Sequence, residues 1–338
     1  MKFTQLFMLF CVWQVHAQVS DFKKIKFDKA DRIAAEHKHE KLNNLPVLVY
    51  TLTNELDTDV EKFRAIFTWV CSNISNDYQL YAKNMRKRRK LINDSIALKA
   101  WNEKFKKIVF KKLRKRKKTL CTGYAYLIKK MANLAEIECE IVHGFAKTST
   151  IDPEKLTIPN HSWNAVKLNG KWYLCDPTWA SGIPNPESYQ FQFHYNEGFF
   201  LADPQIFAIN HFPLKEKWFL LTNNTSQSFQ SFIEAPILYN DAYRYFSSHS
   251  KPAKMYQSVQ QNDSLTLAFD TYVSFQKKDV HFIIENSFTS KRRMPSFISL
   301  ENQKLCVAYK FTTSGYYDVH LYVKDDLIST YTVEVKKD

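Results

Sequence analysis

The chain has 338 residues, which is enough for two domains, and 45% of them are hydrophobic, so a sizeable core can form. Charged residues make up 24% of the chain, which excludes wholesale disorder. The formal net charge of +14 is concentrated in one place, because residues 83–118 hold 17 lysines and arginines against two acidic residues.

The first residues have the pattern of a secretory signal peptide. Lys2 supplies a positive start, a short apolar run follows, and Val15 and Ala17 are small residues at the spacing of a cleavage site. The run is shorter than the roughly 20 apolar residues that span a bilayer. We therefore expect residues 1–17 to be removed and the protein to be exported, whether secreted, periplasmic or at the cell surface. Without Cys11, five cysteines remain, and this odd number leaves at least one thiol free or paired with another chain.

A helix is predicted over residues 60–75. Thr58 and Glu61 have the spacing of a capping box, in which the two side chains bond the free amides at a helix start. Apolar residues then recur every three or four positions, from Phe63 to Ile74, as on the buried face of an amphipathic helix.

The basic segment 83–118 follows, and its second half has a helical pattern. Trp101, Phe105 and Phe110 are spaced as the buried stripe of a helix rather than as a platform for stacked bases, so nucleic acid is an unlikely partner. We interpret the segment as a solvated, mobile insertion. The alternative is a binding site for an anionic envelope polymer or membrane surface.

Cys121 is predicted to begin a helix that continues to Glu138, because apolar residues repeat at helical spacing and no proline interrupts them. Strand-like runs follow at 140–145, 161–168 and 171–176. A helix N-terminus favours the thiolate form of a cysteine, which is the reactive form. Gly123 permits a close approach by backbone or substrate.

Asn169 and Gly170 predict a two-residue type I′ hairpin between the last two strands. This turn sets a register in which His161 and Asp176 lie on the same face, diagonal to each other and within side-chain reach. A carboxylate behind an imidazole holds its tautomer and stabilises the imidazolium. Cys175 points to the opposite face. The hairpin therefore predicts a His–Asp pair, but it does not place Cys121 beside it.

After about Thr222, short runs of alternating apolar and polar residues predict a small antiparallel β-sandwich. Examples lie at 265–269, 281–283, 305–309 and 317–323, with turns at Gly315 and Asp325.

Three segments resemble the active-site motifs of transglutaminase-like proteins, most closely those of the kyphoscoliosis peptidase type. They are Cys121 to Ala125, His161 to Val166 and Trp172 to Trp179. Shorter matches occur at 66–70, 73–74, 77–78, 199–204 and 211–213, so the resemblance covers roughly residues 45–221. It implies an α+β fold, a papain-like core of helices packed on an antiparallel sheet, followed by a small β-sandwich domain. The expected division is 18–222 for the core, with the insertion 83–118, and 223–338 for an immunoglobulin-like sandwich.

The resemblance also implies catalytic roles: Cys121 as nucleophile, His161 as base and Asp176 as the residue that orients it. The insertion before Cys121 departs from the family pattern and leaves the second oxyanion donor unidentified, with Gln79 as a weak candidate. Trp163 and Trp179 are expected as core and cleft walls.

Two functions remain open. The first is an exported enzyme that acts on amide bonds through an acyl-thioester on Cys121, as a peptidase or amidase or as a transglutaminase, with a protein or peptide substrate. The second is a non-catalytic binding or adaptor protein of the cell envelope. No cofactor or metal is implied, because the sequence has neither a ligand cluster nor a phosphate-binding loop.

Overall fold

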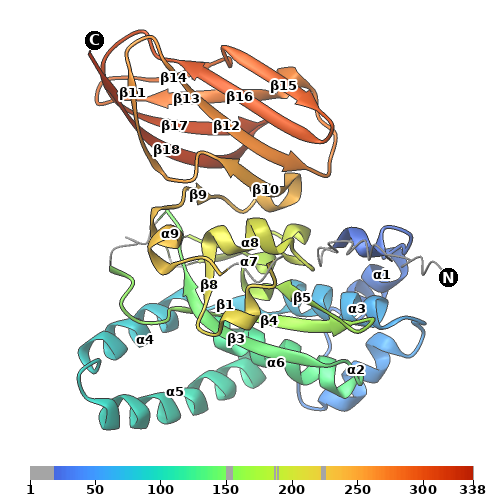
Figure 1. The fold of residues 1–338 in the computed structure, drawn as a ribbon. Coiled ribbons are helices and arrows are strands. Elements are labelled where there is room, and N and C mark those ends of the chain that lie inside the picture. The colour runs from blue at the N-terminus through green and yellow to red at the C-terminus, as the bar shows by residue number, and fades with distance from the viewer. Residues whose placement is uncertain (1–18, 150–154, 186–187, 189, 222–225, 338) are drawn as a thin grey trace, which may run out of the picture.

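The computed structural model describes residues 19–149, 155–185, 188, 190–221 and 226–337. The expected signal peptide and its cleavage point after Ala17 lie outside the described residues. Among the described helices, none combines the length and apolar character needed to cross a bilayer. Figure 1 shows the C-terminal strands stacked at one end of the molecule and the helical α+β core at the other.

The N-terminal part of the core is helical. Its elements are η1 (Val19–Phe22), α1 (Asp28–Glu36), α2 (Leu45–Thr53) and α3 (Asp59–Asn73). The predicted capping box is confirmed at the start of α3, where the Thr58 hydroxyl accepts from the Glu61 amide and the Glu61 carboxylate accepts from the Thr58 amide. Phe63, Ile66 and Phe67 on this helix are fully buried, so α3 runs through the centre of the core.

The core also contains a four-stranded antiparallel sheet with the strand order β5-β4-β3-β8. The strands are β3 (Cys139–Ala146), β4 (His161–Leu168), β5 (Lys171–Cys175) and β8 (His211–Pro213). Asn169 and Gly170 both have positive φ, as a type I′ turn requires. The predicted register is confirmed, because Leu168 pairs with Lys171 and Val166 with Tyr173.

Helix α6 (Cys121–Leu134) packs against this sheet and begins at Cys121 as predicted, although it ends four residues earlier than expected. After β5, short elements connect the core to the C-terminal strands. They are α7 (Pro177–Ser181), β6 (Gly182–Pro184), β7 (Phe191–Phe193), η3 (Glu197–Phe199), α8 (Pro204–Asn210), η4 (Glu216–Trp218), α9 (Phe229–Glu234) and α10 (Ala242–Tyr245).

The basic segment forms two helices, α4 (Tyr78–Lys90) and α5 (Ser95–Arg116). Most of its lysines and arginines are exposed, as expected of a solvated insertion, but the segment is helical and one face of it is buried. Three apolar side chains of α5, Phe105, Val109 and Leu113, are buried, and this face holds the helix against the core. The two ends of the segment meet in a short parallel ladder of β1 (Ser75–Asn76) and β2 (Lys118–Thr119).

The C-terminal part is a β-sandwich of two facing sheets (Figure 1). One sheet has the order β10-β12-β16-β15, and the other has β11-β18-β17-β13-β14 with β9 beside β18. The pair β11–β18 is parallel, whereas the sequence pattern predicted antiparallel strands alone. The strands are β9 (Ile237–Leu238), β10 (Phe246–Lys251), β11 (Tyr256–Gln260), β12 (Ser264–Thr271), β13 (Val280–Glu285), β14 (Ser290–Arg293), β15 (Phe297–Glu301), β16 (Lys304–Lys310), β17 (Gly315–Val323) and β18 (Asp326–Lys336), with η6 (Lys277–Asp279) before β13.

A buried lysine links the core to the segment that leads into the sandwich. The side-chain nitrogen of Lys147, the residue after β3, donates to the carbonyl oxygens of Phe232 (2.6 Å) and Ala235 (2.5 Å). Asn210 of α8 donates to the Leu238 carbonyl at 2.6 Å. These bonds satisfy polar groups that burial would otherwise leave unpaired.

The Asp77 carboxylate joins α4 to α5, and its replacement should destabilise the protein. Its carboxylate accepts from the Leu80 amide at the start of α4 (3.1 Å) and forms an ion pair with Lys112 of α5. Asp77 is 2% exposed, so Asp77→Ala leaves Lys112 without its partner. We expect the free energy of unfolding to fall by about 2–4 kcal/mol, measured by urea denaturation.

Asp94→Ala is the matched control. Asp94 caps α5 through the Ala97 amide at 2.9 Å, but it is exposed, so its loss should cost only about 1 kcal/mol. Equal losses for the two variants would contradict an anchoring role for Asp77.

Candidate active site

Cys121 is the first residue of α6, and its side chain is nearly buried at 6% exposure. The amides at the start of an α-helix have no partner within the helix and carry partial positive charge, which favours a thiolate there. The turn before the helix is tight, because a Cβ at Gly123 would lie 1.8 Å from the Thr119 hydroxyl oxygen. Glycine at 123 is therefore required by the neighbouring side chain.

The position of α6 relative to β4 is held by Asn164. Its side-chain amide donates to the carbonyl oxygens of Ala125 (2.9 Å) and Glu140 (3.2 Å), on α6 and β3. Asn164 is completely buried, so these bonds are made away from water and hold the helix that carries Cys121 against the strand that carries His161.

The predicted pairing of His161 and Asp176 is confirmed. Nε2 of His161 lies 2.6 Å from Oδ2 of Asp176, and the carboxylate is fully buried. The other carboxylate oxygen, Oδ1, accepts from the amides of Thr178 (2.8 Å) and Trp179 (3.2 Å), because Asp176 also caps α7. The carboxylate is thus fixed at both oxygens.

The pKa of His161 reflects both Asp176 and Cys121. Burial alone would lower the pKa of His161, but the charge and hydrogen bond of Asp176, with the Cys121 side chain as a further partner, raise it to about 10. Burial would raise the pKa of Asp176, yet His161 and His211 hold it well below its usual range. Because Nε2 of His161 faces the carboxylate, Nδ1 is the nitrogen left for the thiol.

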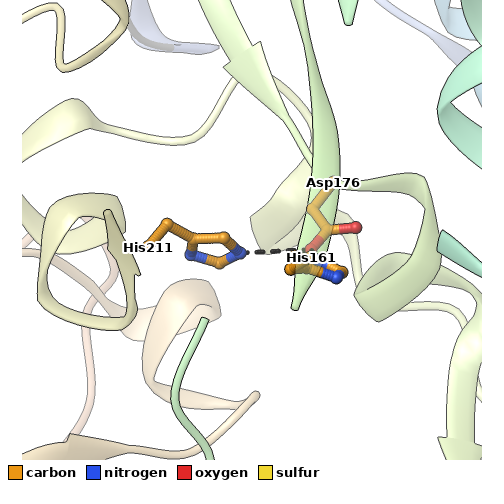
Figure 2. A group of neighbouring side chains, drawn as sticks. All are labelled: His161, Asp176 and His211. Carbon is orange, nitrogen blue, oxygen red and sulfur yellow. Dashed lines mark hydrogen bonds and ion pairs between the residues drawn. The ribbon is translucent and has the colours of Figure 1, made fainter. Parts of the chain in front are cut away.

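His211 is a member of the site that sequence reasoning missed. Figure 2 shows its ring directed at Asp176, and its Nε2 lies 3.1 Å from the same Oδ2 that bonds His161. Burial, with the charge of His161, lowers the pKa of His211 to about 4, although Asp176 opposes the shift. Nδ1 of His211 faces the Phe207 carbonyl at 3.2 Å, so both ring nitrogens face acceptors. A neutral His211 has one N–H, and the charged carboxylate is the stronger of the two acceptors for it. The segment 211–213 was noted as a family match, and the sequence offered no other signal.

Two tryptophans flank the imidazole, with different exposure. Trp179 is half-buried, and its ring lies 5.4 Å from that of His161 at an interplanar angle of 29°. Trp163 is completely buried and packs against His161 and His211. Trp179 can therefore face a bound molecule, whereas Trp163 belongs to the core beneath the ring.

The α4–α5 pair covers the thiol. Phe105 and Val109 of α5 form an apolar cluster with Cys121, and Tyr81 of α4 packs against it. Arg88 of α4 donates to the Pro159 carbonyl at 2.8 Å. Burial lowers the pKa of Arg88, and the charge of Cys121 opposes that shift. The inserted helices therefore form one wall of the site.

Gln79, the weak oxyanion candidate, lies exposed in the first turn of α4. It does not join the hydrogen-bonded group of His161, Asp176 and His211. The start of α6 supplies backbone amides beside Cys121, so the second donor stays unassigned.

The ligand atoms of His161, Asp176 and His211 lie within 4.8 Å of one another, close enough to suggest a metal site. However, both imidazoles already bond the same carboxylate oxygen directly. A metal ion would have to displace both hydrogen bonds, so the arrangement fits a hydrogen-bonded triad better than a metal centre.

The raised pKa of His161 predicts a pH-dependent stability. Its folded pKa of about 10 exceeds the ordinary value of 6.5, so its contribution is full below pH 6.5 and is lost as the pH rises towards 10. Relative to His161→Gln, the wild-type free energy of unfolding should fall across this window by on the order of a few kcal/mol. Urea denaturation at several pH values measures the difference.

His143→Gln is the control. Burial lowers the pKa of His143, so its titration lies on the acid side of the window in which His161 loses its proton. A flat difference between wild type and His161→Gln would show that His161 is not held as an imidazolium.

The core is similar in sequence to several known proteins. Residues 47–177 match the transglutaminase-like superfamily. Kyphoscoliosis peptidase from Homo sapiens is 33% identical over 198 residues, which cover 58% of this chain and 27% of that protein. The Mus musculus protein is 32% identical over 197 residues, with the same coverage. Hillarin from Drosophila melanogaster is 24% identical over 210 residues, covering 58% of this chain and 23% of that protein.

Similarity to solved structures is weaker. A structure described as a crystal structure of a TGase has a TM-score of 0.27 and 17% sequence identity. The match covers 54% of this chain and 40% of the TGase chain. The filamin domain of Lin-41 has a TM-score of 0.20 and 14% sequence identity. The match covers 23% of this chain and 82% of the Lin-41 domain. Scores this low carry no argument. The matched segment holds Cys121 and His161 and ends one residue beyond Asp176. Residues 47–177 of this chain are therefore a transglutaminase-like segment.

Proposed function

We propose that this chain is an exported enzyme that acts on amide bonds of proteins or peptides through an acyl-thioester on Cys121. The observation that carries the proposal is the His161–Asp176 pair: Nε2 of His161 lies 2.6 Å from the buried carboxylate, and the Cys121 side chain helps to raise the pKa of the same imidazole. Because the matched segment spans about a quarter of the length of the curated relatives, activity is inferred from the site. Export rests on the signal-like pattern of residues 1–17.

The geometry supports a two-step reaction. The Cys121 thiolate attacks the amide carbonyl, a C–S bond forms, and the C–N bond breaks as protonated His161 gives its proton to the leaving amine. Water or a second amine then attacks the thioester, loses a proton to His161 and releases the thiolate. Asp176 holds the imidazole in place throughout.

Hydrolysis is the preferred second step. Nothing in the described site marks a dedicated pocket for an amine, and water needs none. The two outcomes are therefore peptidase or amidase activity with water, and transglutaminase activity with an amine.

A digest of proteome-derived peptides tests the proposal directly. Wild type should release new peptide termini that Cys121→Ala does not. Cys306→Ala is the matched control, because Cys306 is a free cysteine on the sandwich strand β16. Adding monodansylcadaverine measures amine transfer in the same reaction. Identical peptide profiles for wild type and Cys121→Ala would contradict the proposed enzymatic function.

The second candidate is a non-catalytic adaptor that uses the core as a binding groove. It is favoured by the narrow access to Cys121, which is 6% exposed beneath the α4–α5 pair. Alkylation of Cys121 by iodoacetamide faster than of free cysteine at neutral pH supports the enzyme, and slower alkylation supports the adaptor.

His211 should act on the reaction through Asp176. Replacing it by phenylalanine removes one hydrogen bond to the carboxylate, so kcat should fall about tenfold with KM little changed. His211→Gln keeps an N–H donor and should recover most of the rate. A glutamine variant as slow as the phenylalanine variant, with equal stability, would contradict this positioning role.

A further inference from the structure

The α4–α5 hairpin, residues 78–116, projects from the core on the side away from the β-sandwich (Figure 1). Its base is closed by the β1–β2 ladder, and its far end is the turn at residues 91–94. We propose that this hairpin is a docking surface for a lipid bilayer that contains anionic lipid.

Charge is the first argument. Apart from its buried stripe, the hairpin is covered by exposed cations, and none of them forms an ion pair with an acidic side chain that the structure describes. The exposed cations are Lys83, Arg86, Lys87, Arg89, Lys90, Lys99, Lys104, Lys106, Lys107, Lys111, Arg114, Lys115 and Arg116. Lys112 is the member that does form an ion pair, with Asp77. A cationic surface of this kind is attracted to anionic headgroups.

Exposed isoleucines at the far end are the second argument. Ile96 is 82% exposed and Ile92 is 43% exposed, and they bracket the turn between the two helices. Exposing a branched aliphatic side chain to water is unfavourable, and neither isoleucine belongs to the apolar cluster over Cys121. Apolar side chains flanked by basic ones are the combination that inserts into the boundary between headgroups and acyl chains.

The aromatic side chains argue against nucleic acid as the partner. Trp101 stacks on Phe105 at 5.6 Å, and its ring N–H donates to Asn84 at 2.9 Å. Phe110 packs on Tyr126 at 4.4 Å. These rings are occupied within the protein, so they offer no platform for stacked bases. A soluble anionic polymer would use the charges but not the isoleucines.

Vesicle co-sedimentation tests the proposal with the full chain. The protein should sediment with phosphatidylcholine vesicles that contain phosphatidylglycerol and not with phosphatidylcholine alone, and added salt should weaken binding. Ile92→Ser with Ile96→Ser should weaken binding roughly tenfold. Arg89→Glu with Lys90→Glu should abolish it. Neither pair belongs to the apolar cluster over Cys121, so digestion of a small peptide should be unchanged.

Matched controls lie on other faces of the molecule. Val47→Ser with Tyr50→Ser removes two exposed apolar side chains from α2, and Lys291→Glu with Arg292→Glu reverses two exposed charges on β14. Both controls should bind as wild type does. If the isoleucine variant binds fully and only the charge variant loses binding, the proposed partner is wrong. The hairpin would then bind a soluble polyanion and not a bilayer. If the β14 control loses as much vesicle binding as the hairpin charge variant, the hairpin is not the docking surface and the β-sandwich takes part instead.

Discussion

The buried carboxylate of Asp176 is the constraint on which the active site depends. An ionised carboxylate without water is costly unless every oxygen is hydrogen-bonded, and here both oxygens are. The bonds come from β4, α7 and the start of β8, so a single charge joins three elements of the core. His161 can then be held as a cation within reach of Cys121, while His211 stays neutral. Catalytic geometry and core stability are therefore satisfied by the same group.

Part of this arrangement follows from local sequence. Asn169 and Gly170 set the hairpin register, and the register brings His161 and Asp176 together without any knowledge of the remaining fold. The start of α6 at Cys121 was equally local, because helical periodicity begins there. The capping box at Thr58 belongs to the same class. Each depends on residues a few positions apart or on one tight turn.

The rest depended on contacts between distant segments. His211 reaches Asp176 only because β8 pairs with β3, across about 65 residues of intervening chain. The prediction for the basic segment rested on its charge, but three buried side chains of α5 decide its structure. Phe105 and Val109 cluster with Leu120 and Cys121, and Leu113 joins the main core. The alternation of apolar and polar residues likewise does not indicate that β11 pairs with β18 in parallel.

The two-residue ladder between β1 and β2 has a mechanical consequence. Thr119 ends the ladder, and Cys121 begins α6 two residues later, so any displacement of the inserted helices at their base moves the nucleophile. At the distal turn, by contrast, whole helical turns can be gained or lost without altering the ladder. Natural variants of this protein should therefore differ in length around residues 91–94 and preserve the pairing of Ser75 with Lys118.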